Sequence, residues 1–127
     1  MSTPINDPEK AAKVFADDRA NVFHSWSAQA QISPMAIAGG AGSYFWDFTG
    51  KKYLDFSSQL VFTNIGHQHP KVISAIKEQA DVLTTIAPQH ANEARNEAAK
   101  RILEVGGDKF KKVFFTNGGA DGVENAI

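Results

Sequence analysis

The strongest chemical signal in the sequence is a glycine loop, Asn117-Gly118-Gly119-Ala120. It follows a short apolar run and precedes the expected start of a helix. A loop that leads from a strand into a helix leaves free N–H groups at the positive end of the helix dipole. Gly118 and Gly119 also permit close approach of the backbone and positive φ angles. The pattern predicts a cradle for a phosphate group, with a tight turn that binds nothing as an equal alternative.

The spacing excludes two familiar nucleotide-binding loops, because no Lys-Ser or Lys-Thr follows the glycines and the order of the glycines is not GxGxxG. His67 and His69 alternate as two metal ligands on one strand face would. A third ligand is missing nearby, which favours local packing or hydrogen bonds at the start of a helix. We therefore expect no metal site.

The elements before the loop are predicted to form an N-terminal arm and a hairpin. Weak helical spacing over residues 9–20 indicates a helix in the arm. Two aromatic-rich segments, residues 43–47 and 52–56, flank a turn that contains Gly50. Aromatic segments around a glycine turn are typical of a β-hairpin.

Two amphipathic helices and a strand are expected next. One helix opens at Pro70 and carries an apolar stripe to Leu83, and a second opens at Asn92 and ends at Gly106-Gly107. The second helix is expected to bury Ala94, Ala98, Ile102 and Val105. The apolar run Lys112–Thr116 predicts a buried strand, so that strand, glycine loop and helix together indicate an α/β protein.

Composition bounds the class of protein. The 127 residues are 43% hydrophobic and 21% charged, with a formal net charge of -1, which argues against a nucleic-acid partner. No apolar stretch is long enough to span a bilayer, so we expect no membrane partner. The absence of cysteine fits a reducing compartment, and the cytoplasm is the expected location. The sequence stops within an expected helix, which predicts the front part of a longer protein.

From about Asn21 to Ile127 the sequence resembles the class III pyridoxal-phosphate-dependent aminotransferases of fold type I, and the omega-aminotransferase branch in particular. The segments that carry the resemblance are His24–Gln29, Gly42–Asp47 with Gly50–Asp55, Asn64–His67 with His69-Pro70, and Phe115–Glu124. The resemblance implies an α/β fold that is truncated here. Residues 1–65 would form the N-terminal arm and small-domain hairpin, and residues 66–127 would begin the cofactor-binding large domain.

The resemblance also implies roles for individual residues. Gly118, Gly119 and Ala120 would bind the phosphate of pyridoxal 5'-phosphate through backbone N–H groups, although the family often has Ser or Thr at the position of Ala120. Leu60 and Val61 match a segment that lines the substrate pocket, and Trp26 matches it more loosely. The Schiff-base lysine, the aspartate that pairs with the pyridine nitrogen and the stacking aromatic would all lie beyond Ile127. No catalytic residue is therefore expected in this chain, and the chain alone should be inactive.

The expected function of the parent protein is transfer of an amino group from an omega-amino acid or amine to a keto acid such as pyruvate. The resemblance further implies a homodimer or homotetramer. Two alternatives remain open at this point. One is another class III enzyme of the decarboxylase or mutase type, and the other is a noncatalytic α/β segment that binds phosphorylated ligands.

Overall fold

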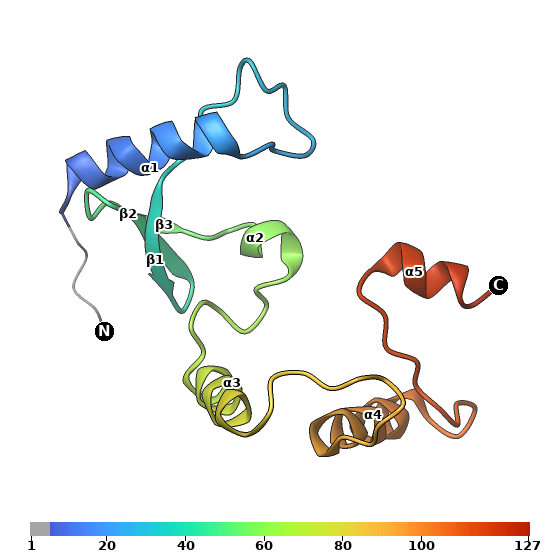
Figure 1. Ribbon diagram of the computed structural model, residues 1–127. Coiled ribbons are helices and arrows are strands. Elements are labelled where there is room, and N and C mark those ends of the chain that lie inside the picture. The colour runs from blue at the N-terminus through green and yellow to red at the C-terminus, as the bar shows by residue number, and fades with distance from the viewer. Residues whose placement is uncertain (1–5) are drawn as a thin grey trace. The chain divides into compact units, whose positions relative to one another are not determined.

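The computed structural model describes residues 6–127 (Figure 1). Its internal contacts divide the chain between Val82 and Leu83 into two units, which are described separately. The first unit holds the sheet and three helices, and the second holds two helices. The combination of helices with a β-sheet confirms the expected α/β class, and the sheet is antiparallel.

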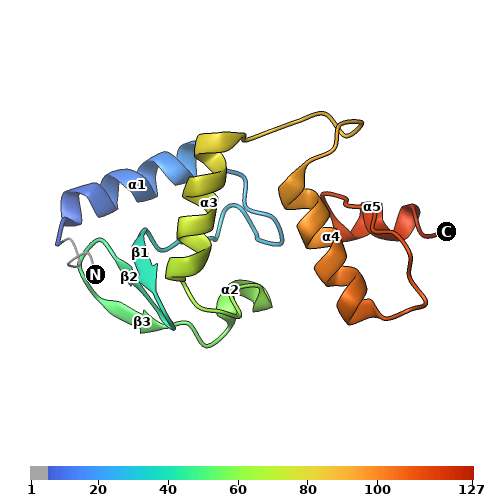
Figure 2. The same ribbon diagram turned by 90° about the horizontal axis from the view of Figure 1, so that it is seen from below.

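Helix α1 (Pro8–Asn21) confirms the helix expected in the arm. Asp7 caps it by accepting a hydrogen bond from the Lys10 amide at 2.9 Å, and Pro8 suits the first helical turn. The Asp7 amide also donates to the Phe48 carbonyl at 2.6 Å, which fastens the start of α1 to the hairpin turn (Figure 2). Phe48, in that turn, is buried.

The sheet has three antiparallel strands in the order β1 (Ile37–Ala41), β2 (Tyr44–Asp47) and β3 (Lys52–Leu54). Strands β2 and β3 confirm the predicted hairpin. Its turn is organised by the Asp47 carboxylate, which accepts hydrogen bonds from the Thr49 amide and hydroxyl, the Lys51 amide and the Tyr53 hydroxyl. On β1, Gly39 lies so close to the Trp46 indole that a Cβ would come within 2.9 Å of it.

The first unit continues through α2 (Ser58–Val61) and α3 (Pro70–Val82). Helix α3 begins at the predicted proline. Between the two helices, His67 forms a backbone bridge with Gly42, with N···O distances of 2.8 and 3.0 Å. The bridge joins residues just past 66 to the sheet of the first unit. The domain division expected at 65/66 concerns the whole protein and stays a prediction.

The second unit contains α4 (Glu93–Gly106) and α5 (Gly119–Glu124). Helix α4 confirms both predicted ends, because the Asn92 side chain accepts from the Arg95 amide at 3.0 Å and Gly107 ends the helix with a φ of 77°. The predicted buried stripe is wrong, because Ala94, Ala98, Ile102 and Val105 are all exposed, Ile102 to 49% and Val105 to 92%. No residue of α4 is buried among the residues that the structure describes.

The strand expected at Lys112–Thr116 is also wrong, because these residues have irregular backbone and Phe114 is 74% exposed. A strand depends on ladder hydrogen bonds to a neighbour. Within residues 6–127 only β1, β2 and β3 form a sheet, so this segment has no partner strand. Over the same residues, no helix has the length and apolar character needed to cross a bilayer.

Candidate functional site

The glycine loop leads directly into α5, as expected. Its first helical hydrogen bond runs from the Gly122 amide to the Gly118 carbonyl at 3.0 Å. The amides of Gly119, Ala120 and Asp121 precede that bond and therefore lack acceptors within the helix. The Thr116 hydroxyl donates to the same Gly118 carbonyl at 3.1 Å, which holds the loop against the helix start.

Neither Gly118 nor Gly119 uses the positive φ angles that glycine permits. Gly118 is extended, with φ at -157°. A Cβ on Gly119 would meet nothing within 4 Å, and one on Gly118 would meet only the Asp121 carboxylate at 3.7 Å. The packing of this chain therefore does not demand glycine at either position. Glycine at these positions leaves the backbone open to close approach by a ligand.

Helix α2 is a left-handed turn. The φ angles of Ser58, Gln59, Leu60 and Val61 are 47°, 47°, 59° and 67°. Left-handed backbone costs residues other than glycine about 1–2 kcal/mol each, and a β-branched residue there is a genuine outlier. The turn leaves Leu60 71% and Val61 78% exposed, so both predicted substrate residues are displayed at the surface of this unit. The sequence carries no glycine or asparagine at 58–61 that could have signalled this conformation.

The turn is held from one side by Asp55, a residue that the sequence reasoning did not single out. Its Oδ1 accepts from the Gln59 amide at 3.2 Å, and its Oδ2 lies 2.8 Å from His67 Nε2. Burial raises the pKa of the Asp55 carboxyl, but the hydrogen bonds from Gln59 and His67 outweigh it and hold the pKa below its ordinary value.

The two histidines considered as metal ligands have separate surroundings. His67 pairs with Asp55, whereas His69 contributes its carbonyl to the start of α3 by accepting from the Val72 and Ile73 amides. The His69 Nδ1 is buried and has no hydrogen-bond partner in the described chain. No group of three metal-ligating side chains gathers within residues 6–127.

A cavity of about 460 Å³ opens beside the sheet of the first unit. Its walls are mainly apolar and include residues from β1, β2 and the segment around α2. They are Met35, Ile37, Gly39, Gly40, Phe45, Gln59, Phe62, Thr63 and His67. Trp26, Leu60 and Val61 do not line it, so the predicted substrate residues and this cavity are distinct features.

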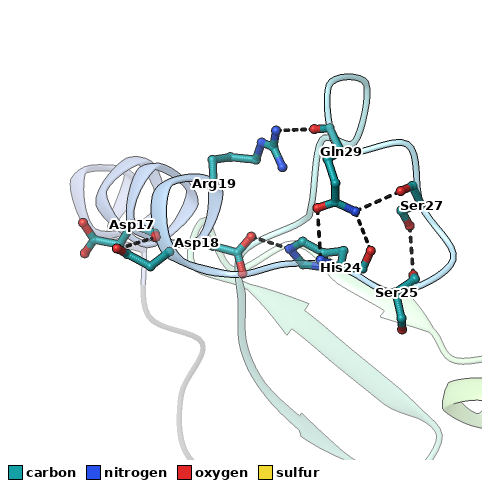
Figure 3. A network of polar contacts seen from close by, with 8 residues as sticks. Asp17, Asp18, Arg19, His24, Ser25, Ser27 and Gln29 are labelled. Atoms are coloured by element: carbon teal, nitrogen blue, oxygen red, sulfur yellow. Dashed lines mark hydrogen bonds and ion pairs between the residues drawn. The ribbon is translucent and has the colours of Figure 1, made fainter.

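A polar network holds the loop from His24 to Gln29 in shape (Figure 3), and Trp26 belongs to this loop. The Gln29 side chain donates to the carbonyls of His24 and Ser27 and accepts from the His24 amide at 3.1 Å. Arg19 of α1 donates to the Gln29 carbonyl, and the Asp18 carboxylate lies 2.7 Å from His24 Nε2. The loop thus presents Trp26 with a φ of 58° and 94% exposure.

The predicted site residues fall into two groups within separate units. Trp26, Leu60 and Val61 belong to the first unit, where all are strongly exposed. Gly118, Gly119 and Ala120 belong to the second, where they are also exposed. Exposed apolar side chains, as in the first group, commonly mark surfaces that contact a ligand or another protein.

Residues 26–127 match the family model of the class-III aminotransferases. The chain is 38% identical over 94 residues to an acetylornithine aminotransferase of Methanocaldococcus jannaschii, covering 74% of this chain and 23% of that protein. It is 37% identical over 102 residues to the 5-aminovalerate aminotransferase DavT of Pseudomonas aeruginosa, covering 76% and 23%. The chain therefore spans about a quarter of the length of these relatives.

Solved structures similar to this chain are also aminotransferases. A taurine:2-oxoglutarate aminotransferase from Bifidobacterium kashiwanohense, in complex with PLP and glutamate, matches with a TM-score of 0.86 and 42% identity over 91% of this chain and 26% of that one. An (S)-enantioselective omega-transaminase from Thermomicrobium roseum matches with a TM-score of 0.85 and 30% identity, covering 91% and 27%. The chain belongs to the class-III aminotransferases, and its fold is part of fold type I. This membership confirms pyridoxal 5'-phosphate as the cofactor of the family.

Proposed function

We propose that the whole protein containing this chain is a transaminase that moves an amino group from an omega-amino acid or amine to a keto acid such as pyruvate. The observation that carries the proposal is the open glycine backbone at the start of α5, in a chain whose family uses a phosphorylated cofactor. The relatives named for 5-aminovalerate and taurine support the donor class, because both compounds carry an amino group away from an α-carbon.

In this proposal Gly118, Gly119 and Ala120 hold the cofactor phosphate through backbone N–H groups. The α5 dipole adds to the attraction, and the Asp121 carboxylate in the same first turn opposes it. Bound cofactor supplies the electron sink for amino-group transfer. The chain's own contribution is to anchor and orient that group, and no catalytic residue is assigned within residues 1–127.

Leu60, Val61 and Trp26 are proposed to contact the amino donor in the assembled enzyme. Their exposure supports this assignment, because large apolar side chains held at a surface by a shaped backbone favour contact with another component. The same side chains, with exposed Phe62, would suit a subunit interface, so we propose a homodimer or homotetramer. A cytoplasmic location is proposed with it.

The test is turnover by the purified full-length protein. It would be incubated with pyridoxal 5'-phosphate, pyruvate and either 5-aminovalerate or taurine, and alanine formation would be followed against a sample without protein. Protein-dependent alanine formation is expected with at least one donor. Carbon dioxide release in a parallel incubation with an α-amino acid, whose amine-bearing carbon carries a carboxylate, would instead indicate a decarboxylating relative. Tight cofactor binding without any turnover would indicate a noncatalytic role.

A further inference from the structure

The Asp55 side chain is only 4% exposed, compared with 28% for Asp18, which also pairs with a histidine. A carboxylate withdrawn from water needs hydrogen-bond partners, and Asp55 uses each oxygen for a different segment. Oδ1 accepts from the Gln59 amide inside the left-handed turn, and Oδ2 lies 2.8 Å from the His67 ring. Asp55 therefore joins two segments that follow it in the chain.

Backbone contacts place Asp55 itself at the edge of the sheet. Its amide donates to the Ser43 carbonyl at 2.9 Å, directly after β3, and its carbonyl accepts from the Ser58 amide at 3.4 Å. Asp55 is therefore fixed on the side of the sheet, and its side chain and carbonyl both reach the start of the turn.

His67 gives the carboxylate a rigid partner. The backbone bridge to Gly42 fixes its main chain. Its ring packs so closely on Gly40 that a Cβ there would come within 2.9 Å of the ring Cγ, and it meets Phe45 edge-on with 6.4 Å between centroids. The ring can hold Asp55 Oδ2 in place because it is itself packed against β1 and β2.

We propose that Asp55 is a positioning residue for substrate recognition: anchored by His67, it fixes the left-handed turn through Gln59 and so sets where Leu60 and Val61 stand. Four consecutive residues other than glycine do not keep positive φ angles unless their surroundings impose them. Loss of the anchor would let the turn relax toward ordinary backbone angles, which would move both side chains. The role in recognition rests on the proposed function.

The test compares three variants of the full-length protein loaded with pyridoxal 5'-phosphate. Asp55→Asn leaves one acceptor oxygen for two N–H donors. His67→Phe keeps an aromatic ring against Gly40 but removes the Nε2 donor. Asp47→Asn is the matched control, because Asp47 organises the turn at the opposite end of the same hairpin and makes no contact with residues 58–61. Each protein is measured by hydrogen exchange over residues 57–63 and by steady-state kinetics with 5-aminovalerate or taurine, whichever the wild type uses.

Asp55→Asn should speed exchange in residues 57–63 by about tenfold, the effect of losing one charge-assisted hydrogen bond. It should raise KM for the amine by a similar factor of about ten while leaving kcat within about twofold, because the reacting groups lie elsewhere. His67→Phe should shift both quantities in the same direction, and Asp47→Asn neither. Unchanged exchange in Asp55→Asn, or equal changes in Asp47→Asn, would overturn the proposal.

The two readouts separate this proposal from the proposed function. If the wild type turns over neither amine, the transaminase proposal fails, and the exchange data alone decide whether Asp55 holds the turn. If exchange quickens but KM stays at the wild-type value, the positioning role in substrate recognition is refuted even though the contact is real.

Discussion

Replacing Gly119 tests most directly whether the glycine loop binds phosphate, because the surrounding packing of this chain does not require glycine at that position. A Cβ at Gly119 would meet nothing within 4 Å, and its φ lies outside the left-handed region. Gly119→Ala should therefore leave folding intact and should stabilise the protein by about 0.4–1 kcal/mol, since it restricts the unfolded chain. The cost of any substitution here would come from the ligand and not from the fold.

The expected loss of cofactor affinity is much larger for Gly119→Asp. If the Gly119 and Ala120 amides both donate to phosphate, losing two charge-assisted bonds of about 1.5–3 kcal/mol each would cost about 3–6 kcal/mol. That corresponds to roughly two to four orders of magnitude in affinity. The new carboxylate would also repel a dianionic phosphate. Gly119→Ala adds only a methyl group and should lie between the wild type and Gly119→Asp.

The assay has two parts, each made on the full-length apo protein. Titration with pyridoxal 5'-phosphate, followed by the absorbance of the bound cofactor, gives the dissociation constant, and urea unfolding gives stability. We expect stability and affinity to change in opposite directions for Gly119→Ala. Equal cofactor affinity in the wild type and Gly119→Asp would show that this loop is a plain tight turn and would refute the phosphate assignment.

Three further predictions concern the chain, the assembly and the hairpin. The 127-residue chain alone, incubated with cofactor, an amine and pyruvate, should form no more alanine than free cofactor does; turnover above that blank would contradict the expectation that this chain holds no catalytic residue. The full-length protein should sediment as a dimer or larger species, and an active monomer at micromolar concentration would count against the proposed assembly. In the hairpin, the Thr49 hydroxyl, with further hydrogen bonds from Tyr53 and the Thr49 and Lys51 amides, lowers the pKa of Asp47 although burial opposes it. Because the folded-state pKa is depressed, this stabilisation is present at neutral pH and is lost as the pH falls through that pKa. Asp47→Asn should therefore flatten the acid-side decline of the urea midpoint, and an identical decline in both proteins would argue against it.

Local chemistry in the sequence determined most of the element boundaries. Pro70 and Asn92 mark helix starts, and Gly107 ends α4, because caps and proline act within one turn of backbone. The hairpin around Gly50 was readable for the same reason, since turn chemistry is local. The family resemblance also came from sequence alone, because it depends on the order and spacing of short motifs.

Only the tertiary structure decided the features that depend on residues far apart in the chain. The Asp55–His67 pair spans 12 positions, and the left-handed turn that it borders has no local signal. The segment Lys112–Thr116 shows the converse, because its apolar composition favours a strand but no neighbouring strand pairs with it among residues 6–127. A helix satisfies its backbone hydrogen bonds within its own segment, whereas a strand or a buried carboxylate needs partners that only the folded chain can supply.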